Sequence, residues 1–311
     1  MEILDRKSTS LLRGVCMIMI LLHHCYQNWG FFFGGGNSFV DGVLHDSGYL
    51  STGVFFFLSG YGLYLSMKKN NFILPPSYVK IRIVKLLVPY VIASIFVGIL
   101  ETYLGIFKFS NIFYFFLLST SNGEPYWFLI VILGLYVITF VLFTNKKISD
   151  PILYLTIAVL LYAVIMRASM LGLHWYNSVI CFPVGMYVGK YITKIKSLSM
   201  IPLLGIFLLY FLTLYPKGQC AVVLLFSFIS VIVMKFLPFQ DSKLISWVKY
   251  VGDNSLLFFF AHGLAIRLVI DLFNTNNIAT NYIAAFVLSL GITVFYSLIQ
   301  KLIMNNLMPA I

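Results

Sequence analysis

Charged residues are scarce in this chain, and acidic residues are the scarcest. Only 10% of the 311 residues are charged, Lys and Arg outnumber Asp and Glu by 21 to 10, and 60% of the residues are hydrophobic. The mean hydropathy is +0.95. A water-soluble domain could not cover its surface with so few charges, whereas helices surrounded by lipid need few. The composition therefore excludes an ordinary soluble protein and indicates an all-α integral membrane protein.

Cysteine is also rare, and its spacing lacks a metal-binding or redox pattern. The four cysteines, Cys16, Cys25, Cys181 and Cys220, include no Cys-x-x-Cys pair. All four lie in or beside apolar runs, where cysteine behaves as a small hydrophobic residue, so we expect no metal site. The polar connections are too short to hold a soluble catalytic domain. We expect a single transmembrane domain over 1–311, with any chemistry carried by its helices.

Ten apolar runs approach the length of about 20 residues that a helix needs to cross a bilayer. The predicted spans are approximately 11–29, 48–67, 83–103, 125–144, 151–167, 175–192, 200–215, 219–236, 254–273 and 281–304. A further apolar stretch from Ile112 to Leu118 is too short to cross, and we expect it to lie at the interface or to re-enter.

The basic residues predict the orientation of these spans. If both termini are cytoplasmic, 17 of the 21 basic residues fall on the inner side. Only Lys108, Arg167 and Lys217 fall outside, and Arg267 lies within the ninth span. This asymmetry is typical of plasma-membrane proteins with several spans. The net charge of +11 therefore reflects orientation, and no nucleic-acid-binding motif accompanies it.

A histidine pair interrupts the first predicted span. Ten residues separate Arg13 from His24, so a helix places His24 about 16 Å beyond Arg13. With Arg13 at one membrane face, His24 lies near the middle of the bilayer, where an ionisable residue is a candidate functional residue. The neighbouring His23 is rotated by about 100° around the helix, so we expect it to pack or to orient other groups.

Six motifs follow one another in a characteristic order along nearly the whole chain. They are Arg13 followed by His24, Gly53-Val-Phe-Phe-Phe-Leu-Ser-Gly-Tyr61, Arg82-Ile-Val-Lys85 before Pro89-Tyr90, Trp127-Phe-Leu129, Phe182-Pro-Val-Gly-Met186, and Gly252-Asp-Asn-Ser-Leu256 with His262. Together with the ten spans, they resemble the acyltransferase-3 family. The resemblance implies a membrane enzyme that transfers an acyl group, commonly acetyl from coenzyme A, to a hydroxyl of a cell-envelope polysaccharide, oligosaccharide or glycolipid.

The resemblance also assigns catalytic roles. It places the catalytic histidine of the family at His24, and a neutral imidazole can take the proton of an acceptor hydroxyl as a general base. A transient acyl-histidine is the alternative mechanism. Arg13 is expected to bind a donor phosphate or to anchor the site. His262 matches another recurrent histidine, for which we expect a substrate contact or a supporting role.

The remaining substrate contacts are expected from the other motifs. Acyl-coenzyme A is the donor substrate rather than a tightly bound cofactor, and its phosphates suit basic side chains near the cytosol. The candidate substrate-binding residues are Arg82, Lys85, Ser59, Tyr61, Glu124, Trp127 and His262. Many members carry an acidic residue where this chain has Phe55, so a carboxylate that orients the histidine is not expected from the second span.

Two other classes of protein suit the same composition. A transporter or flippase also has about ten spans with few intramembrane charges, although carriers more often show two related halves. A non-catalytic partner of a polysaccharide-assembly machine is the other alternative. Substitution of His24 would leave the function of such a partner unchanged, whereas it would abolish the activity of an enzyme.

Overall fold

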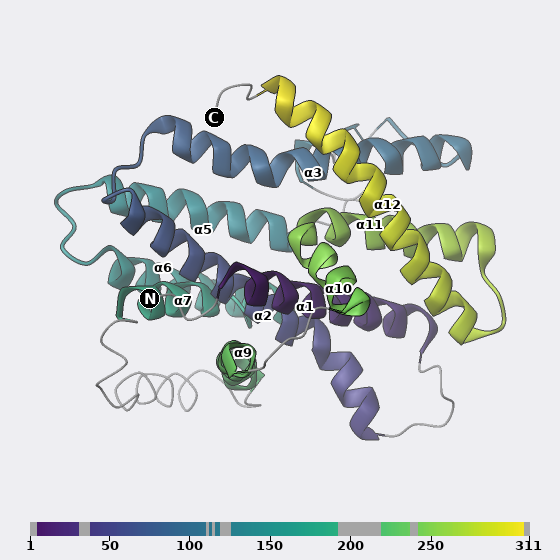
Figure 1. The fold of residues 1–311 in the computed structure, drawn as a ribbon, viewed down its shortest axis with the longest axis horizontal. Helices are drawn as coiled ribbons and strands as arrows, with labels where there is room; N and C mark the ends of the chain where they lie inside the picture. The colour runs from purple at the N-terminus through teal and green to yellow at the C-terminus, as the bar shows by residue number, and fades with distance from the viewer. Residues whose placement is uncertain are drawn as a thin grey trace. The chain divides into compact units, whose positions relative to one another are not determined.

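The structure, a computed structural model, describes residues 5–30, 38–109, 112–113, 116–118, 126–191, 219–236 and 242–307. Within these ranges, each regular element is a helix (Figure 1). The elements are α1 (Arg6–Trp29), α2 (Ser38–Lys69), α3 (Pro76–Tyr103), α5 (Trp127–Thr144), α6 (Pro151–Ala168), η1 (Leu173–Trp175), α7 (Cys181–Tyr191), α9 (Gln219–Phe236), α10 (Lys243–Asp253), α11 (Ser255–Leu268), η2 (Val269–Phe273) and α12 (Ile278–Leu307).

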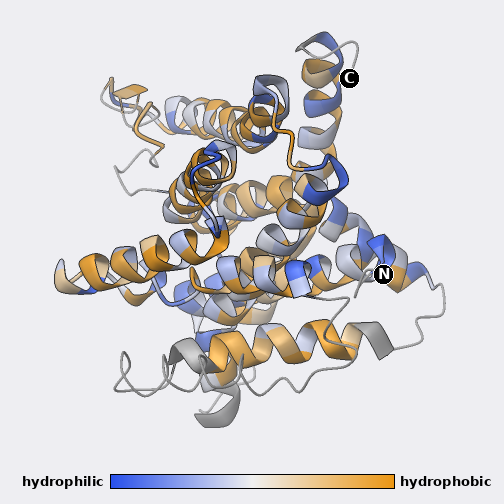
Figure 2. Ribbon diagram, turned by 90° about the vertical axis from the view of Figure 1, so that its left-hand side faces the viewer, coloured by the Kyte–Doolittle hydropathy of each residue, from blue (hydrophilic) through white to orange (hydrophobic). Residues whose placement is uncertain are grey.

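Seven helices of the described part are long and apolar enough to cross a membrane. They are α1, α2 from Gly42 onward, α3, α5, α6, α11 continued by η2, and α12 up to Asn306. Figure 2 shows apolar residues along much of their length. All seven coincide with predicted spans, so the described part confirms the prediction of a helical protein with several helices able to cross a membrane.

The predicted span over 175–192 is wrong as a continuous helix. Turns occupy Tyr176 to Ile180, and α7 begins only at Cys181, so the helix has 11 residues. Pro183 lies in the first turn of α7, the position where a residue without a backbone N–H costs no helical hydrogen bond, and it therefore favours a helix start here.

Three other predictions about the spans stay open. The span over 200–215 lies outside the described residues, and the apolar part of α9, Val222–Met234, is shorter than a full span. Ten spans with cytoplasmic termini therefore stay a prediction. The stretch from Ile112 to Leu118 is described only at 112–113 and 116–118.

The start of α1 is capped by an acidic side chain. The Asp5 Oδ1 atom accepts a hydrogen bond from the backbone N–H of Ser8 over 2.6 Å. This bond satisfies an amide that has no partner within the helix, and it lowers the pKa of the Asp5 carboxyl. The cap therefore fixes where the helix that carries Arg13 and His24 begins.

The chain forms two compact units. The first combines Met1–Cys16, Asp46–Pro75 and Gly134–Gly252, and the second combines Met17–His45, Pro76–Leu133 and Asp253–Ile311. The chain passes from one unit to the other within α1, α2 and α5.

Close contact between α2 and α7 organises the first unit. A Cβ atom added to Gly60 would collide with the backbone oxygen of Phe182, and one added to Gly185 would collide with that of Phe57. Small residues at helix crossings allow this approach in membrane proteins. The two glycines of these motifs therefore have a packing role.

The short helix α10 packs on the first part of α1 in the same way. A Cβ atom added to Gly14 would meet the backbone oxygen of Val248, and one added to Gly252 would meet that of Ser10. Gly252 opens the last of the sequence motifs, and Gly14 directly follows Arg13. The motif at Gly252 thus holds the segment of α1 that carries Arg13.

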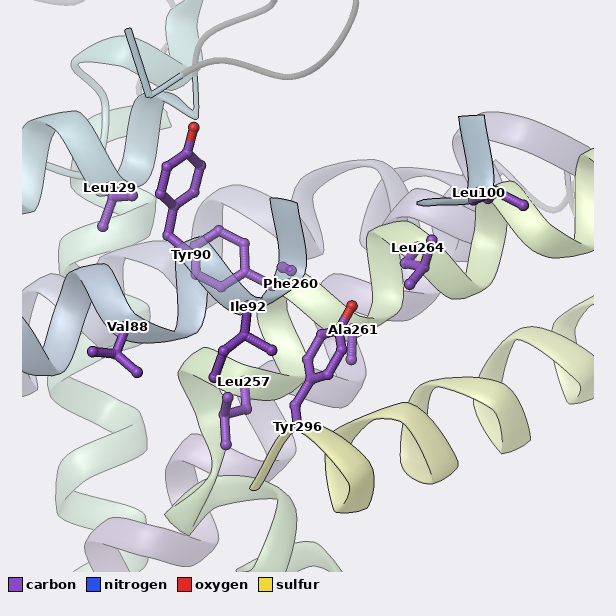
Figure 3. Packing of buried hydrophobic residues seen from close by; sticks show 11 residues of the cluster. Val88, Tyr90, Ile92, Leu100, Leu129, Leu257, Phe260, Ala261, Leu264 and Tyr296 are labelled. Atoms are coloured by element: carbon purple, nitrogen blue, oxygen red, sulfur yellow. The ribbon is translucent and has the colours of Figure 1, made fainter. Parts of the chain in front are cut away.

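The core of the second unit lies among α3, α11 and α12 (Figure 3). The Tyr90 and Phe260 ring centroids are 5.9 Å apart, and those of Phe96 and Tyr296 are 5.4 Å apart. The buried aliphatic members include Ile92 and Leu257, both labelled in Figure 3. Close packing of these three helices gives the unit a rigid base for α11.

The crossing of α2 and α7 predicts that alanine substitution at Gly60 and at Gly62 changes the stability of the protein differently. Gly60→Ala should lower the free energy of unfolding by about 2 kcal/mol, because its methyl group overlaps the α7 backbone. Gly62→Ala is the matched control, since a Cβ atom there meets nothing within 4 Å. It should be neutral or stabilising, because Ala favours helix. Unfolding of both variants in detergent tests this, and equal stability would contradict the assigned packing.

Candidate active site

His24 of α1 and His262 of α11 lie together in the second unit. Their ring centroids are 5.1 Å apart with an interplanar angle of 25°, so the imidazoles are stacked. His262 is buried at 4% exposure, and His24 is half-buried. The Phe259 ring packs against His262 at a centroid distance of 5.5 Å. Two histidines that are 238 residues apart in sequence thus share one apolar environment.

Each of the two rings has an oxygen partner at Nδ1. The His24 Nδ1 atom lies 3.0 Å from Oε1 of Gln27, one turn later on the same helix. The His262 Nδ1 atom lies 3.2 Å from the backbone oxygen of Phe258. Partners at these distances fix the orientation of both rings about their side-chain bonds.

The end of α1 is anchored close to His24. Gly30 has a φ of 75°, a conformation that glycine adopts at low cost at a helix end, and its N–H donates to the Tyr26 oxygen over 2.8 Å. The Tyr282 hydroxyl of α12 donates to the Gly30 oxygen over 2.7 Å. Asn28 Nδ2 donates to the His24 backbone oxygen over 2.8 Å. The bonds of Gly30 and Tyr282 hold the last turn of α1, and the Asn28 side chain adds a bond within the helix.

His23 has a separate set of contacts. Its Nδ1 atom lies 3.0 Å from the Leu44 backbone oxygen in the first part of α2, and its ring is edge-on to His45 at 6.4 Å. The ring also meets His24 edge-on, with centroids 5.2 Å apart. These contacts agree with the packing role expected for His23.

The predicted basic residues of α3 lie near the start of that helix. The Arg82 Nη2 atom donates to the Tyr78 hydroxyl over 3.3 Å, and its guanidinium carbon lies 5.3 Å from the centre of the Tyr78 ring. This contact holds the Arg82 side chain along its own helix. Lys85 is exposed.

The other predicted contact residues are distributed over both units. Trp127 is the first residue of α5 and is half-buried in the second unit, with its ring edge-on to Phe128 at 6.0 Å. Ser59 and Tyr61 of α2 belong to the first unit, as does Arg13. Tyr61 is buried, and Ser59 and Arg13 are half-buried. Their shared role with His24 stays a prediction, and Glu124 lies outside the described residues.

Sequence analysis missed a charged pair inside the second unit. The Glu101 carboxylate of α3 is buried at 2% exposure and receives Nη1 of Arg267 over 2.9 Å. Nε of Arg267 also contacts Asp271 over 3.4 Å. The signal was available, because two opposite charges inside two apolar spans are expected to pair with one another.

The described residues contain no candidate metal centre. No group of three or more His, Cys, Asp or Glu side chains among them is arranged to hold a metal ion. The described groups nearest the centre of this arrangement are the imidazoles of His24 and His262. Two stacked imidazoles in an apolar setting suit proton transfer or nucleophilic attack.

Comparison with known protein families identifies the class. A family model described as an acyltransferase domain matches residues 6–299 of the chain. The chain belongs to the acyltransferase-3 family, as its motifs predicted, and it is a membrane acyltransferase. No curated protein and no solved structure matches it.

The buried ion pair predicts that loss of the Arg267 side chain destabilises the protein more than loss of the charge on its exposed partner, Asp271. Arg267→Gln should lower the free energy of unfolding by about 3 kcal/mol, because it leaves the Glu101 carboxylate buried without its cation. Asp271→Asn is the control at the more exposed contact and should cost less than about 1 kcal/mol. Unfolding in detergent measures both, and Glu101→Gln combined with Arg267→Gln should recover much of the loss. Equal effects of the two single variants would argue against this account.

Proposed function

We propose that this acyltransferase takes an acyl group, most simply acetyl, from cytosolic acyl-coenzyme A. It transfers the group to a hydroxyl of a cell-envelope polysaccharide, oligosaccharide or glycolipid, with His24 as general base. The observation that carries the proposal is the stacked pair of His24 and His262 within a chain of the acyltransferase-3 family. A histidine inside a membrane span is energetically unfavourable, so a histidine at this position is expected to have a function.

The proposed reaction is a direct transfer. The acceptor hydroxyl oxygen attacks the carbonyl carbon of the thioester while Nε2 of His24 takes the hydroxyl proton. The carbon–sulfur bond then breaks, and the proton passes from the imidazolium to the departing thiolate, which leaves as free coenzyme A. His262 covers one face of the His24 ring and limits its rotation. The alternative, in which Nε2 carries the acyl group transiently, uses the same atom.

The donor is proposed to bind through basic side chains on the cytosolic side. Arg82 and Lys85 lie in the first turns of α3, and Arg13 precedes His24 on α1. Guanidinium groups bind phosphate through two hydrogen bonds, and lysine binds it as a point charge. The contact of Arg82 with Tyr78 reduces the freedom that this side chain loses on binding.

The acceptor is proposed to contact hydroxyl, carboxylate and aromatic groups. Trp127 offers a ring face on which a sugar can stack, and Glu124 precedes it in the chain. Ser59 and Tyr61 offer hydroxyls for the acceptor or the donor. Sugars are bound in proteins by such combinations of a stacking ring and polar groups, which supports a carbohydrate acceptor.

The test of His24 is an acetyl-transfer assay with purified protein. Wild type is supplied with acetyl-coenzyme A labelled in the acetyl group and with an envelope polysaccharide extract. Label in the polysaccharide and free coenzyme A are both quantified by chromatography. His24→Ala should lower the acceptor-dependent rate at least about a hundredfold, the typical contribution of a general base. His174→Ala is the matched control, since His174 lies in the short helix η1 and belongs to none of the six motifs, and it should keep the wild-type rate.

The outcomes of this assay separate the classes of function. Transfer that persists in His24→Ala would reject the histidine as base. A wild type that transfers nothing to any envelope fraction would favour a carrier or a non-catalytic partner, for which transport in sealed vesicles is the next measurement.

The donor site makes a separate prediction. Arg82→Ala should raise the KM for acetyl-coenzyme A about tenfold with little change in kcat, because a lost charge-assisted hydrogen bond costs about 1.4 kcal/mol. Lys108→Ala removes a basic residue predicted to lie on the outer side and should leave the KM unchanged. Steady-state kinetics at saturating acceptor decides this, and a loss of kcat alone would place Arg82 outside the donor site.

A further inference from the structure

The ring of His24 has a hydrogen-bond partner that the family motifs do not include. Oε1 of Gln27 lies 3.0 Å from Nδ1 of His24 and comes from the next turn of α1. Residues three apart on a helix lie on the same face, so the contact is built into α1 itself. Gln27 lies outside the quoted motifs, and nothing in the sequence marks it as functional.

The chemistry of this contact decides which ring nitrogen carries the hydrogen. A side-chain carbonyl oxygen has no hydrogen to donate and only accepts. With Oε1 of Gln27 facing the ring, Nδ1 of His24 acts as the donor, which leaves Nε2 of the neutral ring with its lone pair. We infer that Gln27 is a positioning residue that holds His24 with the hydrogen on Nδ1, so that Nε2 faces the acceptor hydroxyl as a base.

This inference deepens the proposed function and rests on His24 as its base. Two contacts then divide the task of positioning the ring. Stacking on His262 fixes the plane of the imidazole, with an interplanar angle of 25°. Gln27 fixes the tautomer. The His262 ring has the same arrangement, because its Nδ1 faces the Phe258 carbonyl oxygen at 3.2 Å, and this oxygen also only accepts.

A neutral amide suits this task beside the half-buried ring, and Gln27 itself is exposed. A carboxylate at the same place would also accept from Nδ1, but its charge would favour the imidazolium, which has no lone pair with which to take a proton. The amide orients the ring and adds no charge. The turn that carries Gln27 is itself held, because the Tyr282 hydroxyl donates to the Gly30 oxygen at the end of α1.

The test reads the tautomer directly. Protein labelled with nitrogen-15 in its five histidines is studied by NMR in lipid nanodiscs, because protonated and unprotonated ring nitrogens differ widely in chemical shift. Loss of a signal in His24→Asn assigns His24. Wild type should show the hydrogen on Nδ1, and Gln27→Leu, which has no acceptor, should show a mixture or the hydrogen on Nε2. The kcat should fall about tenfold with an unchanged KM for acetyl-coenzyme A, the usual effect of losing an orienting partner.

Two further variants separate positioning from a general structural effect. Gln27→Glu keeps an acceptor oxygen within reach and should restore the hydrogen on Nδ1 and part of the kcat. Asn28→Leu is the matched control, because it removes the bond from Asn28 to the His24 backbone oxygen and leaves the ring contact intact. It should behave as wild type in both measurements.

Specific results would overturn the inference. A wild-type His24 with its hydrogen on Nε2 would do so, as would a Gln27→Leu variant with unchanged tautomer and kcat. Failure of the proposed function is distinguishable, since a wild type without acetyl transfer still gives a nitrogen spectrum, and that spectrum decides the tautomer by itself.

Discussion

Pairing of polar groups that lie between apolar helices organises much of the second unit. Glu101 has Arg267 at 2.9 Å, and the Gly30 carbonyl has the Tyr282 hydroxyl at 2.7 Å. The ring of His24 has Gln27. These partners are important because an unpaired polar group in apolar surroundings destabilises the fold by several kcal/mol. These pairs join α3 to α11 and α1 to α12, so the bonds that satisfy buried polar groups also fix the helices.

The same pairing links the fold to the chemistry. His24 lies near the end of α1, where Gly30 and Tyr282 hold the last turn, and His262 lies on α11, which packs in the core with α3 and α12. The anchored helices hold the two imidazoles in their stacked arrangement. A general base must lie within reach of the proton that it takes, in a fixed geometry, before its pKa can affect the rate. The packing therefore supplies the first requirement of the proposed transfer.

Sequence reasoning identifies elements whose signal is local. Apolar runs of spanning length located α1, α3, α5, α6 and α12, and the spacing of Arg13 and His24 located the candidate base. The resemblance added His262, which the structure stacks on His24. The start of α7 was missed because the apolar run around Pro183 hides a proline that favours a helix start. Glu101 and Arg267 are 166 residues apart, and their pairing was missed although two opposite charges inside apolar spans signal it.

Gln27 illustrates why a site can be less predictable than its catalytic residue. The resemblance suggests an orienting carboxylate on the second span, but this chain has Phe55 there, and Gln27 was not among the expected partners of the histidine. The structure supplies an oxygen from the helix of the histidine itself. A partner at a distance of three residues is geometrically available to any helical histidine. The contact at Gln27 is therefore recognisable only from the fold, which shows that this oxygen faces Nδ1 of the ring.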